Sequence, residues 1–270
     1  MSVEMSKDHN TGLVMPAPAP SSLVTRRNAL VGGAAGLLLA GCDQINASPT
    51  VKAALSLGEK ATHGAQRLVT DRNALAREFS RADISPVFRQ NGNQNPGTAE
   101  YNALAANAFA DWTLSVDGMV AHPLRISLAQ LMAAPRRTQI TRHDCVEGWS
   151  AIGEWSGVPL GLVLKRAGMS SNARYVVFHC ADSTGGLPYY ESIDMIDAFH
   201  PQTILATHMN GALLTVGHGA PLRLRVERQL GYKQAKYVMG VQAVASLDGI
   251  HGGKGGYWED HRGYQWFAGI

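Results

Sequence analysis

The sequence predicts an α+β fold with mixed β-sheets and short helices. Many short apolar strands are interleaved with short helices and glycine-rich loops, a pattern that favours this fold class. The 270 residues are 45% hydrophobic and 17% charged, which excludes a wholly disordered chain. The 24 Lys and Arg residues only slightly outnumber the 21 Asp and Glu residues, so no nucleic acid is expected as a partner.

The regular elements begin with a hairpin, because apolar and polar residues alternate over 112–116 and Asp117-Gly118 is typical of a turn. Ser127 is expected to cap a helix over 128–134, which Pro135 ends. The other expected elements are a helix over 71–79, a strand over 138–143, a helix over 160–167, strands over 175–180, 204–209, 212–216, 222–226 and 237–244, and irregular loop from Gly252 onward.

The N-terminus has the features of an export signal. Arg26 and Arg27 precede a weakly apolar run over 29–40, as in twin-arginine signals, which export proteins already folded. The alternative is a chance pair of arginines before a core helix. The glycines of the apolar run make such a helix costly, because each glycine destabilises a helix interior.

The apolar run ends in Leu39-Ala40-Gly41-Cys42, which resembles a bacterial lipoprotein cleavage site. Residues 1–41 are therefore expected to be removed, and Cys42 to carry the lipid that anchors a periplasmic protein to the membrane. The alternative is cleavage nearby with Cys42 left unmodified. No apolar run is long enough to span a bilayer. The expected organisation is a signal over 1–41, a tether over 42–84 and one domain over 85–270.

Two cysteines remain in the body of the chain, and the residues alone allow three interpretations. Cys145 follows a predicted strand, and Cys180 ends another. They could form a disulfide, which is possible in an exported protein. They could instead join His143 and His179 in a zinc or copper site. The third interpretation is a metal cofactor held by a single thiolate.

Several motifs support the third interpretation. They are Cys-Val-Glu-Gly-Trp-Ser over 145–150, Trp-Ser-Gly-Val-Pro-Leu over 155–160, and the stretches 172–178, 199–203, 219–223 and 231–233. In this order they resemble the molybdopterin-binding domain of the sulfite-oxidase superfamily, over about Ser85 to Ile270. The resemblance is closest to the periplasmic, twin-arginine-exported type represented by the catalytic subunit of methionine-sulfoxide reductase. It implies the sulfite-oxidase-type molybdopterin-binding fold.

The resemblance implies a set of site residues. Cys145 matches the cysteine whose thiolate binds molybdenum beside the two dithiolene sulfurs of the cofactor. The implied cofactor-binding residues are Asn91, Cys180, His218, Arg223, Gln234, Ala235 and Lys236. At the position of Cys180 the methionine-sulfoxide reductase type has threonine, and at the position of His218 it has asparagine. A guanidinium such as that of Arg223 can bind the cofactor phosphate through two hydrogen bonds, and an ammonium such as that of Lys236 acts as a point charge.

The resemblance also implies the reaction and the electron partner. The expected chemistry is a two-electron reduction, or oxygen-atom transfer, on a small S- or N-oxide such as methionine sulfoxide. The chain has no Cys-x-x-Cys-His motif for haem. Electrons are therefore expected to be exchanged with a separate membrane haem b subunit or c-type cytochrome. The alternatives are sulfite-type oxidation, which the negative charge of Glu147 disfavours, and a non-enzymatic exported module with a Cys145–Cys180 disulfide.

Overall fold

The computed structural model describes residues 48–270, and the chain divides into two compact units, 1–60 and 61–270. The expected export signal over 1–41 and the expected lipid attachment at Cys42 lie outside the described residues. The domain boundaries expected over 42–84 and 85–270 stay predictions. None of the helices within 48–270 is both long and apolar enough to cross a membrane.

The prediction of a helix over 71–79 is wrong. Helix α2 spans Pro49–Val69, and the chain beyond it continues without a helix as far as the short 3-10 turn η1 (Arg81–Asp83). The Asp71 side chain accepts a hydrogen bond from the backbone N–H of Asn73 at 2.9 Å, a local bond that competes with helix formation. Further on, the N–H of Phe79 donates to the carbonyl of Ile140, so this segment runs along a strand of the body.

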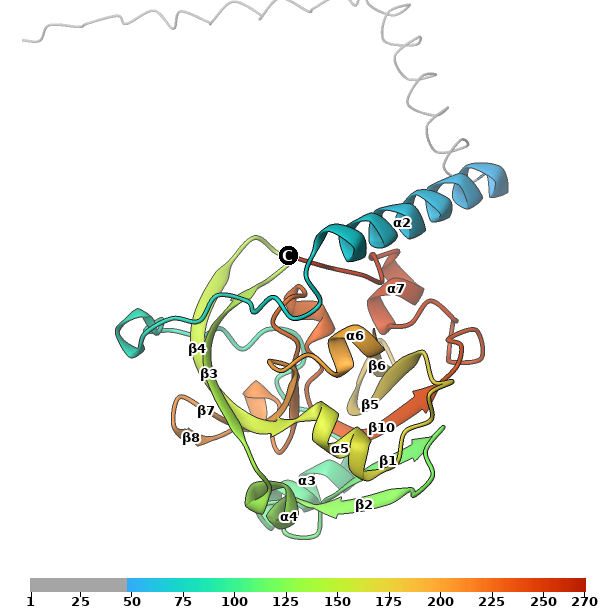
Figure 1. Ribbon diagram of the computed structural model, residues 1–270. Coiled ribbons are helices and arrows are strands. Elements are labelled where there is room, and N and C mark those ends of the chain that lie inside the picture. The colour runs from blue at the N-terminus through green and yellow to red at the C-terminus, as the bar shows by residue number, and fades with distance from the viewer. Residues whose placement is uncertain (1–47) are drawn as a thin grey trace, which may run out of the picture. The chain divides into compact units, whose positions relative to one another are not determined.

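One sheet of the body has five strands and mixed direction, in the order β2-β1-β10-β5-β6. Its strands are β1 (Thr113–Gly118), β2 (Leu124–Ser127), β5 (Tyr175–Thr184), β6 (Leu187–Asp194) and β10 (Val238–Val244). Strand β1 pairs with β2 as an antiparallel hairpin, as expected, and with β10 in parallel. The mixed α+β architecture is thereby confirmed (Figure 1).

The second sheet is antiparallel and has the order β3-β4-β7-β8, with β9 paired to β7. Its strands are β3 (Arg137–Asp144), β4 (Ser150–Pro159), β7 (Ile204–Met209), β8 (Ala212–Leu213) and β9 (Arg223–Arg225). Figure 1 shows β3 and β4 as a long curved ribbon. Strand β4 was not predicted, because Gly153, Gly157 and Pro159 interrupt its pattern of β-forming residues.

Short helices connect and flank the strands. They are α3 (Ala99–Ala106), α4 (Leu128–Ala133), α5 (Leu160–Arg166), α6 (Met195–Ala198) and α7 (Tyr257–Arg262), with 3-10 turns η2 (Val216–His218) and η3 (Gly231–Lys233). The expected cap of α4 is confirmed, because the Ser127 side chain accepts from the N–H of Gln130 while the Gln130 side chain accepts from the N–H of Ser127. Helix α7 lies where irregular loop was expected, so that expectation is wrong.

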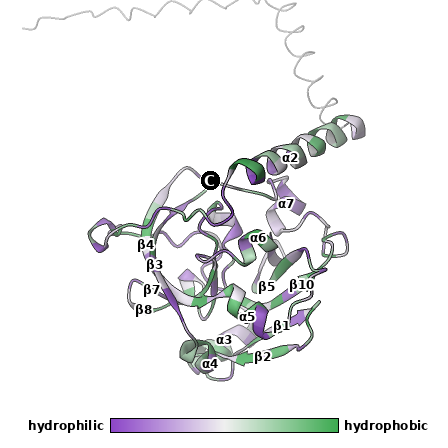
Figure 2. Cartoon of the chain, viewed as in Figure 1, coloured by the Kyte–Doolittle hydropathy of each residue, from purple (hydrophilic) through white to green (hydrophobic). Residues whose placement is uncertain are grey.

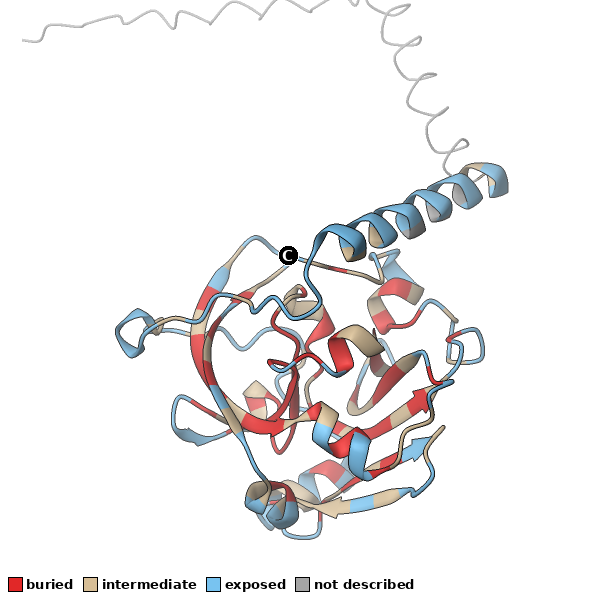
Figure 3. Cartoon of the chain, in the orientation of Figure 1, coloured by how far each residue is buried: buried red, intermediate tan, exposed pale blue. Residues whose placement is uncertain are grey.

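The hydrophobic core lies between the strands of the body. Trp155 of β4, Leu160 of α5 and Val176 and Phe178 of β5 are each fully buried. Figure 3 shows buried residues running along β4, β5 and β10, and Figure 2 shows that the first half of β5 is hydrophobic. The core thus fixes β4 and β5, the strands next to the cavity described below.

Gly157 allows β4 to approach β7 closely. A Cβ atom at this position would overlap the carbonyl oxygen of Leu205 and the Cα of Ala206, both of which are backbone atoms that cannot rotate away. We therefore expect Gly157→Ala to lower the free energy of unfolding by about 1–3 kcal/mol, the usual cost of overpacking. Chemical denaturation measures the change. Gly249→Ala is the control, because a Cβ atom added at Gly249 would meet nothing within 4 Å. Equal stability of the two variants would contradict the close approach.

Candidate functional site

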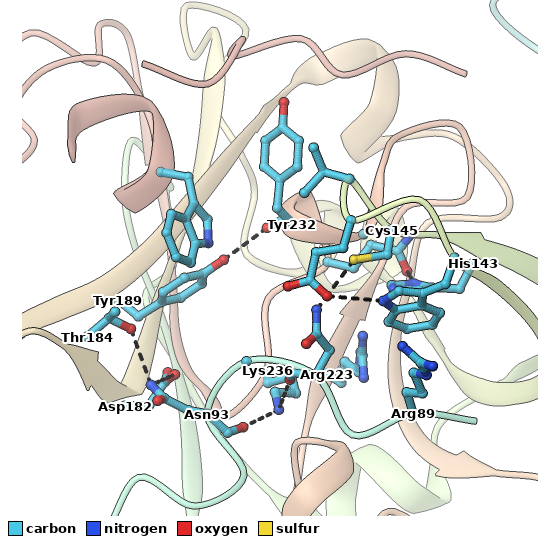
Figure 4. A pocket seen from close by; sticks show the side chains of 18 of the residues that line it. Arg89, Asn93, His143, Cys145, Asp182, Thr184, Tyr189, Arg223, Tyr232 and Lys236 are labelled. Atoms are coloured by element: carbon cyan, nitrogen blue, oxygen red, sulfur yellow. Dashed lines mark hydrogen bonds between the residues drawn. The ribbon is translucent and has the colours of Figure 1, made fainter. Parts of the chain in front are cut away.

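A cavity of about 250 Å³ opens in the body between segments that are far apart in the sequence. Its lining comes from residues 88–93, from the turn after β3, from the end of β5 and the start of β6, from the loop 231–236, and from Arg223 of β9. Trp258 and Tyr264, from the region of α7, complete the aromatic part of the wall. Figure 4 shows the side chains that point into this space.

Cys145 lies in a tight turn at the cavity. The turn follows β3 and is closed by a hydrogen bond from the N–H of Cys145 to the carbonyl of Trp149, at 2.9 Å. Gly148 completes it with a φ of +85°, a conformation that glycine adopts without strain. The thiol is half-buried. Asn91, a predicted site residue, places its Nδ2 3.4 Å from the Cys145 Sγ.

The surroundings of Cys145 keep its thiol protonated in the free chain. Burial raises its pKa above the ordinary value, and the Glu147 carboxylate adds to this shift. The backbone N–H of Glu147 and the Asn91 side chain oppose the shift by donating to the sulfur. A metal that binds this sulfur therefore has to displace a proton.

Arg223 brings an unneutralised positive charge into the cavity wall. Its side chain is buried, its Nη1 donates to the carbonyl of His218 at 3.3 Å, and its Nε has no hydrogen-bond partner. No carboxylate within residues 48–270 forms an ion pair with it. Burial first, and then the nearby Arg225, lower the pKa of Arg223 to about 9. An anion in the cavity would compensate this charge.

The neighbouring arginines are already compensated. Arg225 pairs with Glu227 at 2.6 Å, and its Nη1 lies 3.1 Å from the Nδ1 of His143. Arg228 pairs with Asp197 at 2.9 Å. Arg223 and Arg225 both lie over the ring of Trp155, at 5.2 and 4.3 Å from its centroid. The alternation of β9 therefore puts both guanidinium groups on one side, and only that of Arg223 is free of a carboxylate.

Lys236 lies in the cavity wall but is engaged by backbone carbonyls. Its Nζ donates to the carbonyls of Asn91 at 2.8 Å and Gly217 at 3.1 Å, and also to that of Asn93. These three bonds use all the N–H donors of the ammonium group. Lys236 therefore fastens the 91–93 segment and contributes charge to the cavity, but has no donor left for a ligand. Burial, and then the Arg223 guanidinium, lower the pKa of Lys236 to about 7.

Of the remaining predicted residues, only Gln234 lines the cavity. Cys180 packs against the hydrophobic core, and its partner across the sheet is Val238. His218 uses its ring nitrogens towards Thr215 and the carbonyl of Phe88, and reaches Arg223 only through its own carbonyl. Ala235 is buried and accepts a backbone hydrogen bond from Leu224. Direct contact of these three residues with a cofactor stays a prediction.

Two of the interpretations left open by the residues are not supported by the structure. Cys145 and Cys180 are both free thiols, so no disulfide joins them. Within the described part of the chain, no group of three or more His, Cys, Asp or Glu side chains could hold a metal ion. In particular, His179 faces Gln242 at 3.1 Å, and His143 faces Arg225. The zinc or copper site of four side chains is therefore not assembled.

Several lining residues were not predicted. Arg89 lies with its guanidinium carbon 5.9 Å from the centroid of the Trp149 ring. Asp182 lies near the end of β5, and Trp258 and Tyr264 come from the aromatic tail of the chain. The only signals in the sequence were the polar glycine-rich loop after Cys180 and the unusual aromatic content of the tail. Neither signal says which part of the body such residues contact.

The family is shown by comparison with known proteins. Residues 102–247 match the model of the oxidoreductase molybdopterin-binding domain. This match covers more than half of the chain, so the protein belongs to the molybdopterin-binding oxidoreductases of the sulfite-oxidase superfamily, as the motifs predicted. It is an enzyme of this class, and its substrate is a separate question.

The relatives are named for the reduction of methionine sulfoxide in proteins. A protein of Azospira oryzae, named as the putative protein-methionine-sulfoxide reductase subunit YedZ1, is 37% identical over 96% of this chain and 91% of its own length. The catalytic subunit MsrP of Gluconobacter oxydans is 30% identical over 86% and 74%. That of Xanthomonas axonopodis pv. citri is 37% identical, but over only 52% of this chain and 47% of its own. Among solved structures, the sulfane dehydrogenase SoxCD of Paracoccus pantotrophus matches with a TM-score of 0.47 and 24% identity, over 51% of this chain and 39% of that one.

The residues present fit the cofactor that the family implies. A thiol, a soft ligand suited to such a metal, lies in the wall of the cavity. Arg223 supplies a buried charge with an unused Nε, as an anionic phosphate requires. Asp182, which Figure 4 shows on the opposite side of the view from Cys145, supplies a buried carboxylate oxygen that has no hydrogen-bond partner. The cavity therefore offers a metal ligand, an anion site and a hydrogen-bond acceptor.

The charge of Lys236 makes anion binding in this cavity dependent on pH. The ammonium is charged below its pKa of about 7 and neutral above it, so a dianion is attracted more strongly at lower pH. We expect sulfate, whose charge does not change in this range, to raise the melting temperature of the cofactor-free protein more at about pH 6 than at about pH 8. Thermal unfolding in sulfate and in chloride of equal ionic strength measures the difference. Lys236→Met should remove the pH dependence, and an equal sulfate effect at both pH values in the unaltered protein would contradict it.

Proposed function

We propose that this chain is an exported molybdenum–molybdopterin oxidoreductase that reduces a small S- or N-oxide, or transfers its oxygen atom. The observation that carries the proposal is that one cavity is lined both by a free thiol, Cys145, and by the guanidinium of Arg223, which has no carboxylate partner. The names of the relatives, which refer to methionine sulfoxide, support an S-oxide substrate.

The chain's own residues have separate tasks in this proposal. The Cys145 sulfur would bind the metal, and the Asn91 amide, 3.4 Å away, would donate a hydrogen bond to it. Such hydrogen bonds to a ligand sulfur tune the reduction potential of the bound metal. Arg223 would bind the phosphate of the cofactor. When bound, the cofactor supplies the two-electron redox change and the oxygen-atom transfer, and the protein orients the reactants and controls the electrostatics.

The charges beside Cys145 favour a neutral substrate over a dianion such as sulfite. The carboxylate of Glu147 accepts a hydrogen bond from the Trp149 indole at 3.2 Å, and Arg89 lies near the same ring. Glu147 acts directly on the thiol, because its carboxylate raises the pKa of Cys145, and the charge it brings there is negative. A site for a dianion needs a net positive charge at this point. Sulfite-type oxidation by the same cofactor is accordingly the less favoured alternative.

The electron partner and the location are part of the same proposal. A separate haem protein, either a membrane haem b subunit or a c-type cytochrome, would exchange electrons with this chain in the periplasm. The signal over 1–41 would direct export, and a lipid on Cys42 would hold the domain over 85–270 at the membrane through the tether over 42–84. Such an anchor raises the effective concentration of the enzyme beside a membrane partner.

Replacement of Cys145 tests the metal ligand. A thiolate bound to oxidised molybdenum gives a ligand-to-metal charge-transfer band in the visible spectrum, and serine cannot give this band. We expect Cys145→Ser to lose the band and to reduce methionine-sulfoxide reductase activity at least about 100-fold, the size of loss typical of a residue that acts on the reacting centre. Absorption spectroscopy and activity with a reduced dye measure these effects.

Cys180→Ser is the matched control, because Cys180 is the other cysteine of the body and packs against the core outside the cavity lining. It should keep the band for each molybdenum atom bound, because Cys145 is still present. A Cys145→Ser protein that retains the visible band would overturn the assignment of the metal ligand.

The twin-arginine signal is tested by conservative replacement. Arg26→Lys combined with Arg27→Lys keeps both charges but removes the guanidinium groups that define the motif. We expect the variant to accumulate as precursor in the cytoplasm, whereas a Lys52→Arg control is exported normally. Cell fractionation and immunoblotting give the distribution. Undiminished periplasmic protein in the double variant would rule out this export route.

A further inference from the structure

Helix α2 turns its charged side towards the body at its C-terminal end. Arg67 forms ion pairs with Asp194 and Asp197, each at 2.7 Å, and its guanidinium carbon lies 4.4 Å from the centroid of the Phe267 ring. The His63 ring, one turn earlier in the helix, lies 4.6 Å from the same ring, measured between centroids. All of these residues belong to the second compact unit. The polar side of the last turns of α2 is therefore the side that is bound.

The opposite side of α2 is apolar and exposed. Its apolar residues recur at intervals of three and four positions, the spacing of one face of a helix. They are Val51, Ala54, Leu55, Leu57, Ala61, Ala65, Leu68 and Val69. Leu57 is 68% exposed and Leu68 is 88% exposed, and Figure 3 shows α2 exposed along most of its length. A surface helix normally buries its apolar face against the core, and α2 does the reverse.

The composition of α2 and its place in the sequence indicate what covers this face. Residues 49–69 contain three Lys or Arg residues and only one acidic residue, Glu59, and anionic lipid headgroups attract such a helix. The helix begins seven residues after Cys42, the expected site of a lipid. Seven extended residues span at most about 25 Å. A lipid on Cys42 would therefore hold α2 next to a bilayer surface.

We propose that α2 is an interfacial helix, which lies along a lipid bilayer with its apolar face among the headgroups and the upper acyl chains. Helices of this kind have one polar and one apolar side, and they bind through buried apolar area together with basic charge. Leu55, Leu57, Leu68 and Val69 are the large exposed side chains of the apolar face that would enter the lipid. The inference goes beyond the proposed function and does not depend on the cofactor or the substrate.

The contacts of Arg67 would make the bound helix set the orientation of the body. The Arg67 side chain is only 14% exposed, and Asp197 is fully buried and also pairs with Arg228 at 2.9 Å. Ion pairs removed from water in this way are screened less by salt than those on the surface. A flexible tether limits only the distance of the body from the membrane. A helix held by Arg67 also limits which side of the body faces the lipid.

Hydrogen exchange of the α2 backbone amides tests this proposal. The sample is the full chain carrying Cys42→Ser, which cannot receive a lipid at that position, with vesicles of phosphatidylethanolamine and phosphatidylglycerol. We expect the amides of α2 to exchange at least about tenfold more slowly with vesicles than without them, because a helix covered by lipid opens less often. Mass spectrometry of peptide fragments separates α2 from residues 1–41, so binding of the apolar run in that segment cannot be mistaken for binding of α2.

Leu57→Glu combined with Leu68→Glu should abolish the slowing, because two carboxylates would have to enter the lipid. Both leucines are exposed and neither lines the cavity, so the fold and the site should be unchanged. Leu213→Glu is the matched control, at another exposed leucine, on β8, and should keep the slowing.

Equal exchange of α2 with and without vesicles, or slowing that persists in the double variant, would overturn the proposal. Slowing that appears without lipid as the protein concentration rises would overturn it too, since a second copy of the chain would then cover the face. Each of these outcomes leaves the proposed function standing.

Discussion

The buried positive charge of Arg223 is the constraint on which the site depends. The guanidinium groups of Arg223 and Arg225 both lie over the buried ring of Trp155. Of the two, only Arg225 forms an ion pair with a carboxylate, that of Glu227. An uncompensated buried charge costs several kcal/mol even after relaxation. In the function that we propose, a cofactor phosphate bound beside Arg223 would offset this cost. The close approach of β4 and β7 at Gly157 belongs to the same arrangement, since β9 pairs with β7.

The charged residues of the site divide into those that face a ligand and those that hold the protein together. Lys236 is the clearest case, because its ammonium fastens the 91–93 segment through three carbonyls. That segment carries Asn91 to the sulfur of Cys145 and Asn93 to the carboxylate of Asp182. One lysine therefore supports two contacts on different sides of the cavity. A residue that resemblance assigns to cofactor binding here acts largely through the backbone it organises.

Local sequence predicted those parts of the site that short motifs determine. The prediction that Cys145 directly follows a strand is confirmed, because it lies in the turn after β3, at the cavity. Strand β4 was missed because its glycines and proline conceal the strand pattern. The lining by Asp182 and by the aromatic tail was missed for another reason. Contacts between residues so far apart in sequence arise from packing, which no local pattern specifies.

The central claim is that the Cys145 sulfur is a ligand of molybdenum in the loaded enzyme. X-ray absorption at the molybdenum edge counts the sulfur atoms bound to the metal and therefore addresses this bond itself. We predict one sulfur ligand more than the two of the dithiolene in the unaltered enzyme, and that additional sulfur absent when residue 145 is serine. A spectrum with dithiolene sulfur alone in the unaltered enzyme would contradict the account.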